Sequence, residues 1–508
     1  MNKNKILYCL FIGAFFVVGL IFQFSRQNVS KVRYHQHQEN QSEKDLGICP
    51  LAHTKEELCT HLPIISIETK EPIPGKTILN EQGVTVGYEK TASNQEETLA
   101  SIRTYETKDH YHHLSDKANM EASALIRKRG NSSRSFDKPS YKITFCNKDD
   151  TTIKENIEFL GMYEDSEWAL HGPFLDKTLI RNYMVLNILS KISPYTPNVR
   201  FCELVVNGEY QGIYLLMETI KESESRLDLT NYEEGDQEFS YIFRIEPKVN
   251  TNKVFNNYSF YTMRMEPNTY MEVKYPTIKY QTSEMLKKIE KEVSQIEYDL
   301  FSLHLNKNMD IYDIGIDVDS FVDYYIINEF LLINDSFSAS TYFYKDARGK
   351  LTIGPLWDYN NAFDNYFTDF ESTGFILNNR GWFAALTRDA TFTNLVIQRY
   401  KQLRENILSD EYFETYANET IDWLGSAIDR NYQVWGYSFD INQLTMYERK
   451  QPSNKSNLTI EELNPKNYEE AINMMIDFMK ERGAWLDENI ESLNQYSSDS
   501  RNSSQNVK

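Results

Sequence analysis

Two aspartates, Asp335 and Asp358, carry the clearest chemical signal in this chain. The first follows a predicted amphipathic helix, in which aromatic and aliphatic side chains recur at helical spacing. The second follows a predicted hairpin of two short strands. These elements are expected at residues 320–332, 342–346 and 350–354. Because both aspartates lie on loops that flank one hairpin, their carboxylates could converge on a single point.

Two converging carboxylates suit phosphoryl transfer. One of them orients the attacking hydroxyl group, and the other holds magnesium against the phosphates of a nucleotide. On spacing alone a simpler interpretation stays open, in which Asp335 caps a turn and Asp358 pairs with a nearby arginine or lysine.

A second group of residues could contact phosphate. Residues 129–133 read Arg-Gly-Asn-Ser-Ser, and successive backbone N–H groups in such a loop can line an anion. Lys142 follows on a predicted strand, on the face opposite Tyr141 and Ile143, where it could act as a point charge toward phosphates. The loop matches neither the P-loop nor the kinase glycine-rich pattern. An ordinary hairpin with a solvated lysine is the alternative.

The first part of the body is predicted to be rich in strands. Residues 62–145 contain several short segments with alternating or β-branched apolar residues. Asn207-Gly208 is a two-residue turn signal between expected strands at 201–206 and 212–218. Cys146 and Cys202 also lie on predicted strands.

Helical patterns follow at residues 176–191 and again from residue 367 onward. Asp176 could cap the first of these helices. For Arg181 and Asn182 on that helix, support of the active site and an ordinary surface position are both open. One of the C-terminal segments is predicted as a single helix over residues 411–432.

The chain therefore predicts an α+β protein whose body is too long for most single cores. The expected organisation is a membrane-spanning segment at 1–27, a polar stalk at 28–61, a body at 62–494 and a disordered tail at 495–508. Within the body we expect a β-rich N-terminal lobe at about 62–220 and a helical C-terminal lobe at about 221–494.

The N-terminus predicts export. An uncharged apolar run at residues 6–22 follows Lys3 and Lys5, and it is just long enough to span a bilayer. The residues after it lack the small-residue pattern of a signal-peptidase site, which favours an uncleaved signal anchor. The body is then extracytoplasmic on a single-pass anchor. If the segment is cleaved, the protein is secreted.

The net charge of the chain limits the classes of partner that we expect it to bind. The chain has 54 basic and 74 acidic residues, so its net charge of −20 argues against nucleic acid and would suit a basic protein substrate.

Cys49 and Cys59 are the most local pair of cysteines and are expected to form a disulfide. His110, His112 and His113 are interpreted as a solvated loop, with a metal site as the alternative.

Six motifs in order resemble one family. They are RGNSS, KPSYKITF, LGM with DKTLIRN, VVNGEYQGIYLLMETI, VDSFVDYYIINEF, and a hairpin ending in GPLWDYNNAF. Together they resemble the spore-coat protein H (CotH) kinase-like family over roughly residues 62–493. The resemblance implies a highly diverged protein-kinase-like, two-lobed fold that binds ATP and magnesium. It also implies phosphorylation of serines on protein substrates, notably spore-coat proteins.

Residue by residue, the resemblance implies these roles. Asp335 is the catalytic aspartate and Asp358 the magnesium ligand, as in the DFG motif of ordinary kinases. Lys142 is the phosphate-contacting lysine. The loop near the nucleotide phosphates comprises Arg129, Asn131 and Ser132.

The departures from the family pattern matter for activity. Ser340 stands where many members carry an asparagine, and a hydroxyl is a weaker second metal ligand than an amide carbonyl. The helix at 176–191 has no glutamate to pair with Lys142, so Asp176, Glu203 or Glu218 is expected to serve. We assign Glu218 to the nucleotide site on this basis. The alternative function is an inactive pseudokinase that acts as a surface binding, adhesin-like or spore-coat assembly protein.

Overall fold

The computed structural model describes most of the chain. The described residues are 33–49, 58–80, 85–131, 133–193, 195–247, 254–264, 269–277, 280–303, 305–306 and 309–497. The chain divides into two compact units, Met1–His35 and Gln36–Lys508, and all the described helices and strands belong to the second. The predicted membrane-spanning segment lies outside the described residues. Within them, no helix is both long enough and apolar enough to cross a membrane.

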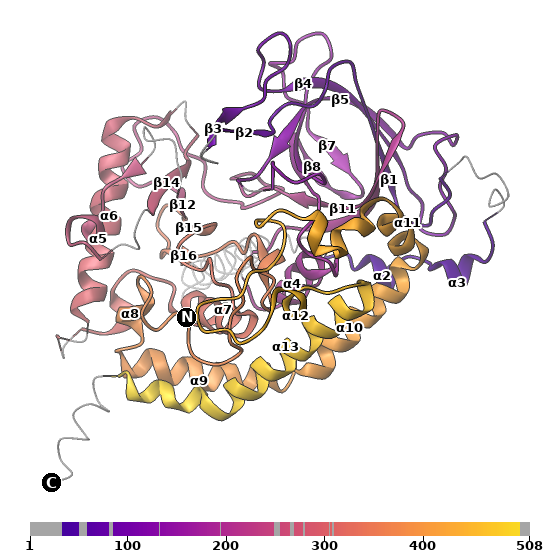
Figure 1. The fold of residues 1–508 in the computed structure, drawn as a ribbon. Coiled ribbons are helices and arrows are strands. Elements are labelled where there is room, and N and C mark those ends of the chain that lie inside the picture. Colours follow the sequence, from indigo (N-terminus) through magenta and orange to yellow (C-terminus); the bar gives the residue numbers. More distant parts are fainter. Residues whose placement is uncertain are drawn as a thin grey trace, which may run out of the picture. The chain divides into compact units, whose positions relative to one another are not determined.

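The N-terminal half of the second unit is built around a closed β-barrel (Figure 1). Its strands in spatial order are β1 (Ile64–Thr69), β10 (Val199–Val206), β11 (Glu209–Glu218), β9 (Glu167–His171), β6 (Ser140–Phe145), β5 (Met120–Arg129) and β4 (Thr98–Tyr105). Neighbouring strands are antiparallel except β1 and β10, which are parallel. Alternate side chains such as Ala124, Ile126 and Ile143 fill the interior because successive strand residues face opposite sides.

A second sheet has five strands in the order β13, β14, β12, β15 and β16. These strands span Val254–Phe255, Tyr270–Tyr275, Tyr241–Glu246, Thr341–Lys345 and Thr352–Ile353. Two small ribbons complete the described strands, one of β2 (Thr77–Leu79) with β3 (Thr85–Tyr88) and one of β7 (Ile157–Phe159) with β8 (Met162–Asp165).

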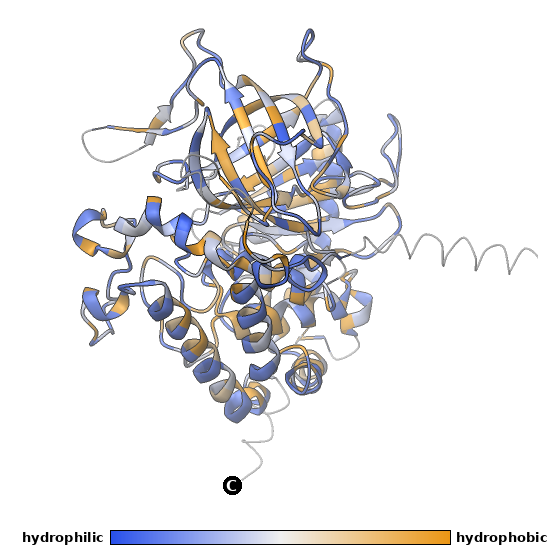
Figure 2. Ribbon diagram, turned by 90° about the vertical axis from the view of Figure 1, so that its right-hand side faces the viewer, coloured by the Kyte–Doolittle hydropathy of each residue, from blue (hydrophilic) through white to orange (hydrophobic). Residues whose placement is uncertain are grey.

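Helices make up most of the C-terminal half. The longer ones are α4 (Arg181–Leu189), α6 (Ser283–Ser302), α7 (Val318–Leu331), α9 (Ala390–Arg404), α10 (Asp410–Leu424), α11 (Ser426–Trp435) and α13 (Tyr468–Asn489). One apolar core joins them to the outer face of the barrel, where Phe201 packs against Tyr183 of α4 and Trp423 of α10. Figure 2 shows hydrophobic and hydrophilic residues mixed on both the barrel strands and the helices. The expected mixed α+β class, with strands first and helices later, is confirmed.

Several sequence predictions need correction. Helix α7 is not amphipathic, because twelve of its fourteen residues are buried and polar residues such as Asn328 and Glu329 lie inside with partners. The surface interpretation of α4 is also wrong, since Arg181 and Asn182 are buried. The predicted single helix at 411–432 is two helices, because the chain turns at Gly425 with a positive φ of 49°.

The expected polar stalk is wrong for the residues that the structure describes from Gln36 to Cys49. Short helices α2 (Gln36–Glu39) and α3 (Glu43–Leu46) pack on the body. Gln36 is buried because its amide bonds both the carbonyl and the N–H of Phe201. Glu43 accepts hydrogen bonds from Ser426, which begins α11. Polar residues can be buried in this way when each group finds a partner.

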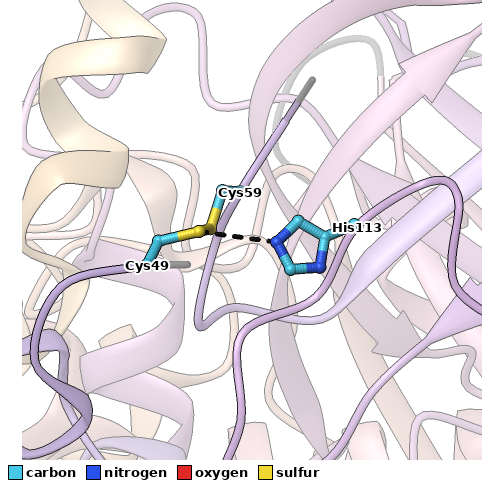
Figure 3. A group of neighbouring side chains, drawn as sticks. All are labelled: Cys49, Cys59 and His113. Atoms are coloured by element: carbon cyan, nitrogen blue, oxygen red, sulfur yellow. Dashed lines mark hydrogen bonds between the residues drawn. A yellow bond between two sulfur atoms is a disulfide. The ribbon is translucent and has the colours of Figure 1, made fainter. Parts of the chain in front are cut away.

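The disulfide prediction is confirmed, since Cys49 is bonded to Cys59 (Figure 3). His113 lies against this pair, with its Nε2 atom 3.4 Å from the Cys49 sulfur, and Asp116 holds the other ring nitrogen at 3.2 Å. His112 and His113 are buried, so the solvated-loop interpretation is wrong for both. Cys146 and Cys202 are free and buried thiols.

Candidate active site

The two aspartates are positioned by α7 and the β15–β16 hairpin. Helix α7 ends at Leu331, and the following Leu332 adopts a left-handed conformation that turns the chain. Asp335 lies on the loop after this turn. Strand β16 ends at Ile353, and Asp358 begins the short 3₁₀-helix η4 (Tyr359–Asn361). The backbone N–H of Phe363 bonds the Leu331 carbonyl at 2.8 Å, which draws the two loops together.

Asp335 is half-buried and hydrogen-bonded on both oxygens. Asn361 donates to one oxygen at 3.1 Å, and the hydroxyl of Tyr366 donates to the other at 3.2 Å. Burial nevertheless raises the pKa of Asp335, although Tyr366, Asn361 and the charge of Arg380 oppose the rise. Arg380 itself is fixed by the carbonyl of Ser336 at 3.1 Å. The carboxylate is therefore held in one orientation but is not neutralised by a direct ion pair in the described part of the chain.

Asp358 is exposed to solvent, and Asp335, Arg129 and Ser340 are the groups that act on its carboxylate. Desolvation raises its pKa, and the negative charge of Asp335 raises it further. The charge of Arg129 and a 3.4 Å hydrogen bond from the Ser340 hydroxyl oppose this rise. Both aspartates and Ser340 line one cavity of about 20 Å³, enough for a single water-sized group. The predicted convergence is thus present in the structure.

The backbone around this cavity is strained. Of the eleven non-glycine residues with positive φ in the described part of the chain, six lie between residues 332 and 364. They are Leu332, Phe337, Ser340, Asp358, Phe363 and Asp364. Such conformations each cost on the order of 1–3 kcal/mol and are concentrated at functional sites. Since Ser340 and Asp358 are among them, the strain falls on the residues that line the cavity.

The barrel contributes a cation, Arg129, to the same region. Arg129 ends β5, and its guanidinium lies over the Trp357 ring at 5.3 Å, next to Asp358 in sequence. Lys142 faces outward from β6, opposite its core-facing neighbours Tyr141 and Ile143, as predicted. Asn131 is exposed, and Ser132 lies outside the described residues.

The carboxylate beside Lys142 differs from the three expected from sequence. Glu97 lies 3.6 Å from the lysine amine and 3.2 Å from Arg127. Glu97 precedes β4, and the sequence offered no local signal for it. Glu97 reaches Lys142 because β4 pairs with β5 and β5 pairs with β6. The second pairing sets Arg127 opposite Lys142.

The three carboxylates that we expected to pair with Lys142 each form an ion pair with an arginine instead. Glu218 is fully buried and binds Arg226 at 3.2 Å and the backbone N–H of Asn198 at 2.9 Å. Glu203 binds Arg430 at 2.9 Å, and Asp176 binds Arg181 at 2.6 Å. Because its carboxylate is closed off by these partners, Glu218 does not occupy the position that we expected at the nucleotide site.

Sequence reasoning missed a third carboxylate near Asp358. Ile245 pairs with Thr341 in the β12–β15 ladder, so the next residues, Glu246 and Ser340, face each other at its end. The charges of Glu246 and Asp358 repel, which contributes to the raised pKa of Glu246 after burial. Arg244 holds Glu246 at 2.8 Å. Nothing near Glu246 in sequence signals this role, because only the strand register brings it to the site.

Asn361 was also missed, although it had a visible signal. It lies three residues after Asp358 in the same WDYNNAF motif, and it contacts Asp335. A polar residue at that spacing follows the aspartate by one turn of the 3₁₀-helix η4.

Comparison with known proteins identifies the family. The CotH kinase protein family matches residues 126–486, which is more than half of the chain. This chain therefore belongs to the CotH kinase protein family. It is 30% identical over 97 residues to the inner spore coat protein H of Bacillus subtilis (strain 168), which covers 19% of this chain and 24% of that protein. The aligned part thus spans about a quarter of that relative's length.

A solved structure was also matched at low similarity. It is the HipA, HipB and operator DNA complex of a Shewanella oneidensis MR-1 toxin–antitoxin system, at 14% identity and a TM-score of 0.24. The match covers 57% of this chain and 65% of that chain, and a TM-score this low carries no argument about the fold.

The donor set fits the groups that the family name suggests. Carboxylates with a nearby hydroxyl are the oxygen ligands that magnesium takes in proteins. The mutual repulsion of Asp335 and Asp358, which raises the pKa of Asp358, is the expected electrostatics of a site that accepts a cation. Arg129 and Lys142 supply positive charge suited to phosphates.

Proposed function

We propose that this protein is a magnesium-dependent, atypical protein kinase that transfers the γ-phosphate of ATP to serine or threonine of a protein substrate. The observation that carries the proposal is the convergence of Asp335 and Asp358 on one cavity, where the charge of Arg129 acts on the second carboxylate. Membership of the CotH kinase family supports nucleotide and metal use.

In this proposal Asp335 orients the acceptor hydroxyl and takes its proton. Its two hydrogen bonds, from Asn361 and Tyr366, fix the carboxylate toward the acceptor. The raised pKa of Asp335 makes it a better proton acceptor at neutral pH than an ordinary aspartate. Bound magnesium would supply charge neutralisation of the phosphates.

Asp358 and Ser340 hold the metal, with Glu246 adding negative charge behind them. Arg129 and Lys142 orient the phosphates, and Asn131 and Ser132 belong to the phosphate loop. Glu97 fixes Lys142, which is the role that Glu218 was expected to fill. No covalent enzyme intermediate is required, because positioning and electrostatics carry this reaction.

The proposed substrate is a basic, serine-rich spore-coat or envelope protein, and the proposed location is the spore surface or the outer side of a membrane. The named relative is an inner spore coat protein, which supports the spore assignment. The net charge of −20 favours a basic partner and opposes nucleic acid. The proposed anchor is the apolar N-terminal segment at residues 6–22.

The alternative is a pseudokinase that binds an envelope or coat protein without turnover. Ser340 favours it, because its hydroxyl lies 3.4 Å from Asp358 and is a weak metal ligand. Transfer of ³²P from labelled ATP to a basic serine-rich protein, such as protamine, separates the two functions. We expect incorporation that requires magnesium and is lost in D335N and D358N but kept in D319N, a change on the exposed side of α7. Absence of incorporation with retained ATP binding would favour the pseudokinase.

A further inference from the structure

A large groove lies beside the proposed catalytic aspartate. Its volume is about 730 Å³, within the usual range of ligand sites, and it is lined by residues of 363–373, 438–465, α13 and the start of α4. Tyr366 lines this groove and also donates its hydroxyl to Asp335. The groove therefore meets the proposed active site at one side chain.

The walls of the groove are held together by hydrogen bonds. The backbone N–H of Gln451 donates to the carbonyl of Phe367 at 2.8 Å, and the backbone N–H of Asp369 donates to the carbonyl of Gln451 at 3.2 Å. Lys450 binds the carboxylate of Asp364 at 2.5 Å. Because both walls are tied by backbone and charged contacts, the groove is a preformed feature of the fold.

Lys177 lines this groove in an unusual state. The residue is only 9% exposed, yet its amine donates to a neutral group, the Phe174 carbonyl, at 2.7 Å. No salt bridge to Lys177 is found among the described residues. Burial lowers its pKa to about 7, against the opposing charges of Glu448 and Asp176. Burial disfavours the charged form of this amine, and a bound anion would favour it as Glu448, which also lines the groove, and Asp176 do.

Arg449 lines the same groove with unused hydrogen-bonding capacity. Its Nη1 atom donates to the Ile441 carbonyl at 2.8 Å, whereas its Nε atom is buried without a partner in the described part of the chain. Two other cations that line the groove already have carboxylate partners. Arg181 pairs with Asp176, and Lys450 pairs with Asp364. Lys177 and Arg449 thus remain available to a ligand that enters the groove.

We propose that Lys177 and Arg449 form a subsite for a phosphate monoester carried by an already phosphorylated residue of the acceptor protein. A dianionic phosphate offers several acceptor oxygens, which suits one ammonium and one guanidinium better than a single carboxylate does. The remaining groove suits a polypeptide, because aromatic residues such as Phe367 and Tyr447 stand beside the acidic residues Glu371 and Asp477.

This inference rests on the proposed kinase function, because the same protein would create the phosphorylated residue that the subsite binds. A polypeptide with its phosphorylated residue in the groove would present a neighbouring serine near Asp335. The consequence is ordered phosphorylation, in which the first phosphate makes the chain a better acceptor for the next.

The test measures peptide binding without ATP, so it does not depend on turnover. Fluorescein-labelled lysine- and serine-containing peptides are compared by anisotropy with matched peptides that carry one phosphoserine at successive distances from the acceptor serine. We expect the best phosphopeptide to bind roughly tenfold more tightly than its unphosphorylated match. K177M and R449Q should remove this difference, and K455M, which changes an exposed lysine of the same groove, should keep it.

Competition with inorganic phosphate identifies the source of the anion. If inorganic phosphate binds as tightly as the phosphopeptide, the subsite takes free phosphate and the acceptor assignment is wrong. Equal binding of phosphorylated and unphosphorylated peptides, or equal losses in K177M and K455M, would overturn the subsite itself. If phosphopeptide selectivity is present but no phosphate transfer is detected, the kinase proposal fails while the subsite stands.

Discussion

The buried ion pair of Glu329 and Arg482 allows a sharp test of how α7 is held. The Arg482 guanidinium binds the Glu329 carboxylate at 2.8 Å and donates to the carbonyls of Ser372 and Gly374 at 3.0 and 2.7 Å. The same carboxylate accepts the backbone N–H of Leu377 at 2.8 Å. The pair therefore ties α7, which precedes Asp335, to α13 and to the loop after the second aspartate.

Removing one partner should be much worse than removing both. Both residues are at most 1% exposed as side chains, and burial raises the pKa of Glu329 and lowers the pKa of Arg482, so each charge is costly alone. Breaking a buried pair typically destabilises by about 3–5 kcal/mol, whereas replacing both ions by apolar residues is often nearly neutral. The entropy of unfolding of a unit this size is about 1 kcal/mol/K, so for E329M we expect a fall in Tm of about 3–5 °C.

The assay is thermal and urea unfolding of E329M, R482M and the double variant E329M/R482M. The double variant should be more stable than either single variant. E491Q breaks an exposed pair with Lys401 and serves as the control, with almost no change in Tm expected. If E329M unfolds like the wild-type protein, or if the two single losses simply add in the double variant, the reasoning about this pair is refuted.

Other predictions concern single groups. Between pH 7 and 10.5 the unfolded chain binds a proton at Lys177 that the folded chain has lost, so stability should rise with pH there, and the rise should shrink in K177M but not in K455M. E246Q should weaken magnesium affinity, measured by titrating magnesium into an ATP-dependent thermal shift, by roughly tenfold, and an unchanged affinity would exclude Glu246 from the metal site. Replacing Cys49 and Cys59 by alanine, which opens a loop with a separation of 10 residues, should lower the free energy of unfolding by about 2.5–3 kcal/mol. A reductant should then lower the stability of the wild-type protein and leave that variant unchanged.

Local signals predicted much of the fold. Asn207 and Gly208 both have positive φ, as the two-residue turn between β10 and β11 requires. Helix α7 and the hairpin after it lie within about two residues of the expected bounds, because apolar spacing and a turn mark them in the sequence. The convergence of Asp335 and Asp358 was one of two interpretations that the local spacing left open, and the family resemblance favoured it.

Long-range placement could not be predicted. The parallel pairing of β1 with β10 joins Ile64 to Glu203, and no local pattern specifies that contact. Glu97 reaches Lys142, and Glu246 reaches Ser340, only through strand registers that the sequence does not state. The burial of α7 was missed for a related reason, since its polar residues are satisfied by distant partners such as Arg482.

The boundaries of the predicted lobes at 62–220 and 221–494 remain predictions. So do the roles assigned to each site residue, because position in a fold does not by itself establish chemistry. The groove with Lys177 and Arg449 was invisible from sequence, since its lining comes from four separate segments.

The central claim, a nucleotide and magnesium site at Asp335 and Asp358, is tested most directly by thermal unfolding with and without ATP and magnesium. A ligand that binds only the folded state at a hundredfold excess over its Kd stabilises by about 2.7 kcal/mol. We predict a rise in Tm that requires both ATP and magnesium, is lost in D358N and is kept in D319N. No shift at millimolar ATP, or a shift that D358N leaves intact, would contradict the account.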